Sequence, residues 1–162
     1  MQPRIFLPRW PAPPAVGGSL ELGEEAVHHV RVLRLRTGDE VVLFGGDDRE
    51  FQARLTAVER RRVVARIEGV HAVSRESSCH IVLGLGVSRG ERMDFAVQKA
   101  VELGVAAIMP LMTRRTQVKL DAKRRASRLA HWGQIVHSAC EQSGRTRIPV
   151  SYTHLTLPTI VS

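Results

Sequence analysis

The sequence has few aromatic residues, few cysteines and no long apolar run, and each shortage argues against a class of protein. Aromatic residues make up 4% of the 162-residue chain, so binding of single-stranded nucleic acid mainly by base stacking is not expected. The two cysteines, Cys79 and Cys140, are far apart and belong to no C-x-x-C pair. This argues against a disulfide framework or a zinc knuckle and favours a reducing compartment, the cytoplasm.

Long apolar segments are also missing. No apolar run reaches the roughly 18 residues that a membrane-spanning helix needs. The amino terminus, MQPRIFLPRW, is interrupted by Arg4 and Pro8, so it lacks the apolar core of a signal peptide. We therefore expect no membrane partner.

Nucleotide and metal motifs are incomplete. Gly84, Gly86 and Gly90 give G-x-G-x-x-x-G, one residue longer than the dinucleotide fingerprint and inside an expected strand. No P-loop occurs. His28 and His29 are adjacent and point different ways, and no further ligand completes a set, so we expect no metal site. We expect a polar edge or an RNA contact at His29 instead.

Positive charge is abundant and clustered. Lys and Arg total 24 against 16 Asp and Glu, which gives a net charge of +8. The clusters are Arg31, Arg34 and Arg36, residues 60–62, and Lys123, Arg124, Arg125 and Arg128. Such a charge favours a polyanionic partner, although an Arg-rich composition can also reflect the source genome.

The first part of the chain has the pattern of short strands with turns. Residues 40–44, 50–58 and 63–67 are expected strands, and residues 24–33 a short helix or strand edge. Residues 11–18 read as a loop and 45–48 as a hairpin turn. Short strands at this spacing predict a small β-barrel over residues 1–73, followed by a linker near residues 71–78.

The second part has a different pattern of apolar residues. Residues 81–87 form an apolar run typical of a strand covered on both faces. A helix with Met93 and Val97 on one stripe follows, ended by Gly104. Residues 105–112 are a second apolar strand, so the segment predicts a βαβ unit.

A long helix is expected next. Asp121 is its predicted N-cap and Gly144 its terminator, and the helix is expected over residues 122–142. The expected buried side is Ala126, Leu129, Gly133, Val136 and Cys140.

Two clusters have both a functional and a structural interpretation. Arg31, Arg34 and Arg36 can clamp phosphates, or they can form a solvated face with Asp39 as local partner. The helix end with Glu141, Gln142 and Arg145 can project into a site, or Arg145 can simply favour the helix C-terminus electrostatically.

With these residues in place, residues 1–149 resemble the RsmE family of ribosomal RNA small-subunit methyltransferases. In the first part the resemblance rests on RIFLP at residues 4–8 and HHVRVLRLRTGDEVVLFGG at residues 28–46. In the second part it rests on RGERMDFAVQKAVELGV, IMPLMTRRTQVKLD and RLAHWGQIVHSACEQSGRTRIP, at residues 89–105, 108–121 and 128–149.

The resemblance implies an α/β fold in which a PUA-like, RNA-binding β-barrel (1–73) precedes the N-terminal part of a SPOUT, or trefoil-knot, domain (79–149). It implies methyl transfer from S-adenosylmethionine to N3 of a uridine in 16S ribosomal RNA, with the small ribosomal subunit as partner and a homodimer as the intact assembly. Applied residue by residue, the resemblance identifies five expected RNA contacts: Arg4, His29, Arg31, Arg34 and Arg36. Its substrate-side candidates are Lys99, Glu102, Arg114 or Arg115, Glu141, Gln142 and Arg145.

The sequence departs from the family pattern near its end. The Gly-rich GPEGG and the LRTETA-type segments, which form the knot and the cofactor pocket, do not occur. Residues 150–162 are interpreted as a non-native tail on an incomplete SPOUT domain. We expect this chain alone to bind S-adenosylmethionine poorly and to be inactive. The alternatives are a non-catalytic RNA-binding module and a small nucleotide-binding α/β protein.

Overall fold

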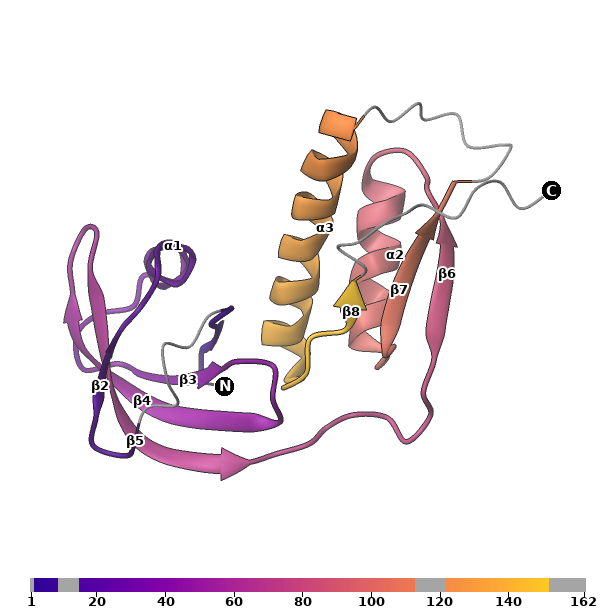
Figure 1. The fold of residues 1–162 in the computed structure, drawn as a ribbon. Helices are drawn as coiled ribbons and strands as arrows, with labels where there is room; N and C mark the ends of the chain where they lie inside the picture. The colour runs from indigo at the N-terminus through magenta and orange to yellow at the C-terminus, as the bar shows by residue number, and fades with distance from the viewer. Residues whose placement is uncertain (1, 9–14, 113–121, 152–162) are drawn as a thin grey trace. The chain divides into compact units, whose positions relative to one another are not determined.

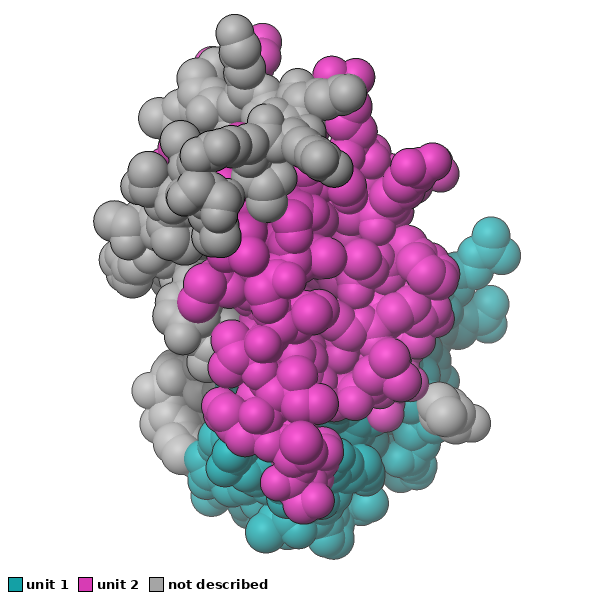
Figure 2. Space-filling model, turned by 90° about the vertical axis from the view of Figure 1, so that its right-hand side faces the viewer, with its two compact units in different colours: residues 1–75, 144–147 teal, residues 76–143, 148–162 magenta. Residues whose placement is uncertain are grey.

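The computed structural model describes residues 2–8, 15–112 and 122–151 (Figure 1). These residues form three helices and eight strands, and the chain divides into two compact units (Figure 2). Unit 1 comprises Met1–Arg75 and Gly144–Arg147, and unit 2 comprises Glu76–Ser143 and Ile148–Ser162. A strand-rich unit followed by an α/β unit is the fold class predicted from the sequence.

Unit 1 contains a five-stranded sheet with the order β1-β3-β4-β5-β2. Its strands are β1 (Arg4–Phe6), β2 (Ser19–Glu21), β3 (Glu40–Phe44), β4 (Arg49–Val58) and β5 (Val63–Ala72). β1 pairs with β3 in parallel, and the other neighbours are antiparallel. β5 continues to Ala72, so the predicted end of this strand at Ile67 is wrong: the long hairpin with β4 keeps it paired.

Helix α1 (Glu24–Val32) packs on this sheet and settles the sequence ambiguity between helix and strand edge. Ala26, Val27 and Val30 are its buried residues, at the spacing of one helical face. They join a single core with inward residues of the strands such as Leu55 and Ile67. Alternate burial along β4 and β5 therefore leaves one face of the sheet for solvent.

Unit 2 contains a parallel sheet with the order β6-β7-β8. Its elements are β6 (Val82–Gly86), α2 (Glu91–Glu102), β7 (Ala107–Leu111), α3 (Ala122–Ser143) and β8 (Val150–Ser151). Figure 1 shows α2 and α3 side by side on the same side of this sheet. The predicted βαβ unit is confirmed, whereas the predicted N-cap Asp121 lies outside the described residues.

The ends of α2 and α3 follow the predicted chemistry. Gly104 follows α2 with φ of 89°, and Gly144 follows α3 with φ of 81°, the left-handed conformation that glycine adopts without strain. Val105 N–H donates to the Ala100 carbonyl at 3.1 Å, which closes the end of α2. Both glycines were correctly predicted as helix terminators.

The buried side of α3 differs from the prediction. Val136 and Cys140 are buried as expected, but Ala126 is exposed, so its predicted burial is wrong. Trp132 and Ala139, which were not predicted, are buried. The fully buried residues of α3 that the structure describes thus begin at Trp132, in the second half of the helix.

The strand β6 is not covered on both faces, and that prediction is wrong. It is an edge strand, and the Val82 side chain is 47% exposed. β7, in contrast, has two neighbours, because Val150 and Ser151 pair with Ala107 and Ile108. Strand β8 thus comes from the first two residues of the segment interpreted as a non-native tail.

Candidate functional site

The end of α1 presents three arginines by a defined backbone motif. Leu35 N–H donates to the Val30 carbonyl and Arg34 N–H to the Arg31 carbonyl, both at 3.0 Å. Arg34 itself has φ of 56°, the left-handed conformation that glycine usually adopts at the end of a helix. A non-glycine residue in this conformation stores strain, which occurs more often at functional sites.

Arg31, Arg34 and Arg36 are all exposed. Asp39, the local partner considered from the sequence, accepts a hydrogen bond from the backbone N–H of Arg36 at 2.7 Å. Within the described residues, the structure shows no ion pair of these three guanidinium groups with a carboxylate. Their charge therefore remains available to an external anion.

Most other arginines of unit 1 are neutralised locally. Arg54 pairs with Glu40 at 2.6 Å and with Glu68 at 2.8 Å. The arginines with a carboxylate partner are Arg4, Arg49, Arg54, Arg62, Arg75 and Arg147. Six of the 13 described arginines of unit 1 thus have their charge compensated by a carboxylate within the protein.

Arg4, a predicted RNA contact, lies inside unit 1 rather than on its surface. Its side chain is 9% exposed and pairs with Glu50, and its guanidinium carbon lies 4.8 Å from the centre of the Phe44 ring. His29, the other predicted contact at this end of the chain, is half-buried in α1. The structure therefore groups Arg31, Arg34 and Arg36 but not Arg4.

Glu50 is the centre of a buried ion-pair network. It pairs with both Arg4 and Arg75, and its side chain is 11% exposed. Burial alone would raise the pKa of Glu50, but hydrogen bonds and charge from Arg75 and Arg4 outweigh it, so the net pKa is lowered. Glu50 is consequently a stable anion within unit 1.

The network also binds the segment Gly144–Arg147, which belongs to unit 1. Arg75 donates to the Gly144 carbonyl at 2.9 Å, and Arg4 donates to the Arg145 carbonyl at 3.1 Å. The Thr146 hydroxyl is fully buried and donates to the Val73 carbonyl at 2.8 Å. These bonds satisfy backbone groups where the chain leaves α3.

The predicted substrate-side residues occupy several places. On α2, Lys99 Nζ lies 2.6 Å from Glu102 Oε2, and Gln98 donates to the same carboxylate at 2.9 Å. The hydrogen bond from Lys99 lowers the pKa of Glu102 below its usual range. Glu102 is therefore an ionised group and a weak proton acceptor.

The other candidates lie at or beyond the end of α3. Glu141 and Gln142 are in its last turn, whereas Arg145 is 4% exposed within unit 1. Arg114 and Arg115 lie outside the described residues. The structure thus brings Lys99 together with Glu102, and it gives Arg145 a buried position.

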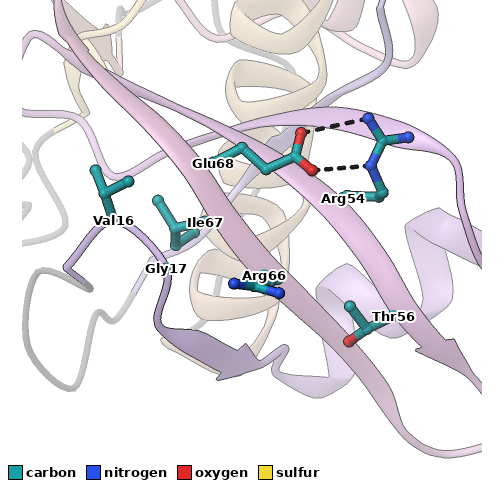
Figure 3. A pocket seen from close by; sticks show the side chains of 7 residues that line it. All are labelled: Val16, Gly17, Arg54, Thr56, Arg66, Ile67 and Glu68. Atoms are coloured by element: carbon teal, nitrogen blue, oxygen red, sulfur yellow. Dashed lines mark hydrogen bonds and ion pairs between the residues drawn. The ribbon is translucent and has the colours of Figure 1, made fainter.

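A surface hollow of about 470 Å³ lies over β4 and β5 in unit 1 (Figure 3). Its lining residues are Val16, Gly17, Arg54, Thr56, Arg66, Ile67 and Glu68. Figure 3 shows the Arg54 guanidinium paired with Glu68, whereas Arg66, the third charged residue of the lining, has no interaction drawn to another lining residue. The hollow contains no nucleophile or proton-transfer pair.

The described residues hold neither a metal-binding cluster nor a membrane-spanning helix. Residues 2–8, 15–112 and 122–151 contain no group of three His, Cys, Asp or Glu side chains placed to hold a metal ion. Among the same residues, no helix has the length and apolar character needed to cross a bilayer.

Sequence reasoning missed Glu50 and Arg75. The structure joins Arg4, Glu50 and Arg75 across separations of 46 and 25 residues, and such long-range pairs leave no local pattern. The one usable signal was that Glu50 is a charged residue at the start of an expected strand, directly before the apolar Phe51.

Two family models cover most of the chain. The model described as RNA methyltransferase domain matches residues 75–162, and the model described as RNA methyltransferase PUA domain matches residues 22–68. The first corresponds to the α/β unit and the second to the curved sheet with α1. Together they define a class: an RNA methyltransferase with a PUA domain.

Individual relatives agree. The chain is 31% identical over 127 residues to the ribosomal RNA small subunit methyltransferase E of Bacillus subtilis, covering 78% of this chain and 50% of that protein. A crystal structure of the Neisseria gonorrhoeae enzyme of that name, bound to S-adenosyl methionine, has a TM-score of 0.88 and 43% identity over 93% of this chain and 61% of that one.

A putative methyltransferase from Legionella pneumophila, in complex with the same cofactor, has a TM-score of 0.88 and 43% identity, covering 93% of this chain and 62% of that chain. The chain belongs to the RsmE family of RNA methyltransferases. It spans about half the length of the curated relatives it matches.

Proposed function

We propose that unit 1 binds ribosomal RNA through the arginines at the end of α1, and that the whole protein methylates N3 of a uridine in 16S ribosomal RNA. The observation that carries the first part is a set of exposed arginines that have no carboxylate partner among the described residues: Arg31, Arg34 and Arg36. Arg is suited to phosphate because its planar donors bind two oxygens at once. Membership of the RsmE family supports the second part.

The substrate side of the proposed reaction uses positioning and charge. The N3 proton of uridine is weakly acidic, so transfer needs a nucleophilic nitrogen held in line with the methyl group. Because Lys99 keeps Glu102 ionised, the pair is better suited to orient RNA than to remove a proton. The remaining proposed substrate-side residues are Glu141, Gln142, Arg145 and Arg114. Because Arg145 is buried, we propose that it positions the segment Gly144–Arg147 and does not contact the RNA itself.

S-adenosylmethionine, when bound, supplies the methyl group. The residues of this chain do not fit it well: the sequence has no GPEGG or LRTETA-type segment, and the edge strand β6 leaves Val82 and Gly84 exposed where a covering layer would be expected. We therefore propose that these 162 residues form only part of the donor site. We also propose that the whole protein is a homodimer, that it acts in the cytoplasm and that its partner is the small ribosomal subunit.

Binding of the 162-residue chain to a fluorescein-labelled stem–loop RNA, measured by anisotropy across a range of salt concentrations, tests the RNA part. The Arg31→Gln/Arg34→Gln variant is expected to weaken binding and to lower the salt dependence by roughly one to two released ions. Arg54→Gln, whose charge is already paired, is the matched control. Equal losses in both variants would contradict the assignment of this surface.

The alternative, a non-catalytic RNA-binding module, is favoured by the complete core of unit 1. Both functions predict RNA binding, and methylation separates them. A version of the chain extended through a Gly-rich segment would transfer a labelled methyl group to 16S RNA if the protein is an enzyme, and would not if it is a module.

A further inference from the structure

The loop that joins β4 to β5 has three consecutive arginines, Arg60, Arg61 and Arg62. β4 ends at Val58 and β5 begins at Val63, and these two residues pair with each other. Glu59 N–H donates to the Arg62 carbonyl at 2.8 Å, which closes the loop. All the side chains of the loop are exposed, so a short, closed hairpin end holds them at the surface.

The three arginines differ in their partners. Arg62 Nε lies 3.0 Å from Glu21 Oε2, and Arg62 Nη1 lies 4.0 Å from Glu59 Oε1. Hydrogen bonding to Glu21 raises the pKa of Arg62. In the described part of the chain, the structure shows no carboxylate partner for Arg60 or Arg61. Of the three arginines, only Arg62 therefore forms ion pairs with described carboxylates, and the charges of Arg60 and Arg61 stay available to an external anion.

The hairpin end lies next to the elements that carry the proposed RNA contacts. Leu22, just before α1, donates to the carbonyl of Val63, just after the loop, at 2.9 Å. The turn that follows Arg36 bonds to Leu55 of β4, where Leu55 N–H donates to the Asp39 carbonyl at 2.9 Å. From Leu55 to Glu59, the first residue of the loop, the chain extends about 13 Å at the usual rise per strand residue, a distance that one RNA backbone easily bridges.

We propose that Arg60 and Arg61 form a second phosphate-binding site, which contacts the backbone of the same RNA that binds at the end of α1. The proposal rests on the proposed RNA-binding function of unit 1 and adds the second contact surface. Phosphate fits this site because the two cations are exposed, lie on a short hydrogen-bonded turn and have no carboxylate partner among the described residues. The site gives affinity and orientation without reading sequence, because contacts to backbone phosphates carry no base information.

Single and double substitutions in the loop test the proposal with a matched internal control. Arg60→Gln, Arg61→Gln and Arg62→Gln each remove one positive charge from the same loop. We expect the double variant Arg60→Gln/Arg61→Gln to weaken binding of the labelled stem–loop RNA at least about tenfold at about 0.1 M salt. The slope of log affinity against log salt should fall by roughly 1.5, whereas Arg62→Gln should change both much less.

Arg60→Lys/Arg61→Lys keeps the charge and should retain most of the slope, and circular dichroism spectra confirm that each variant is folded. If Arg62→Gln loses as much as either single neighbour, net charge alone explains binding and the site is refuted. If the loop variants bind normally while Arg31→Gln/Arg34→Gln does not, the second site is wrong and the proposed function stands. Absence of salt-dependent binding by the unmodified chain overturns both.

Discussion

Replacing Glu50 by Gln should weaken unit 1 severely, because it leaves two arginines without their anion. The carboxylate is 11% exposed and the Arg4 side chain 9% exposed, while Arg75 stays 45% exposed. Removing one partner of a buried ion pair typically costs 3–5 kcal/mol. Water can reach Arg75, so we expect the low end of this range, about 3 kcal/mol.

Hydrogen exchange of the β4 and β5 amides, read by mass spectrometry, measures this loss within unit 1 alone. A loss of about 3 kcal/mol corresponds to exchange faster by roughly a hundredfold. Asp47→Asn is the matched control, because Asp47 pairs with Arg49 at an exposed site where ion pairs contribute little. Exchange in Glu50→Gln within about threefold of the unmodified chain would refute the reasoning.

The difference in hydrogen exchange between Glu50→Gln and the unmodified chain should depend on pH. The folded-state pKa of Glu50 is lowered, so its stabilisation is present above the unfolded-state pKa of Glu and is lost as the pH falls through the lower folded-state value. The ratio of exchange rates between Glu50→Gln and the unmodified chain should therefore be large at neutral pH and shrink in acid. A ratio that grows toward acid would contradict the assigned direction.

Three further predictions follow from particular residues. Gly104→Ala should destabilise unit 2 by about 1–2 kcal/mol, because Gly104 has φ of 89° and an added Cβ there is strained. Gly133→Ala should stabilise it by about 0.5–1 kcal/mol, because that helical site has open space around an added Cβ; urea unfolding followed by circular dichroism measures both, and the same sign for the two would be a refutation. The 162-residue chain should show no tight binding of S-adenosylmethionine in a calorimetric titration, and a tight complex would disprove the proposal that these residues form only part of the donor site.

Local patterns in the sequence were sufficient for most elements of the fold. Glu40–Phe44 is a strand over the predicted residues, because alternation and turn residues specify a strand locally. The buried stripe of α3 was only half right: the helical repeat gives its direction, but not which turns meet a partner. Ala126 is exposed for that reason, and Trp132 is buried.

For the candidate site, the sequence located the exposed arginines at the end of α1, but it could not separate paired from unpaired cations. Arg4 and Arg62 look like their neighbours in the sequence, and only the folded chain brings Glu50 and Glu21 to them. Charge pairing between distant strands is a property of the tertiary structure. A prediction of RNA contacts from arginine clusters alone therefore includes residues that serve the interior.

The return of Gly144–Arg147 to unit 1 makes that unit discontinuous in sequence. A gene cut after codon 75 would encode a protein without Gly144–Arg147, and so without the two carbonyls that accept from Arg75 and Arg4 and the Thr146 hydroxyl that donates to Val73. Unit 1 therefore cannot be transferred to another protein as one continuous segment of sequence. Recombination between family members would have to exchange both pieces together, which ties the inheritance of unit 1 to that of unit 2.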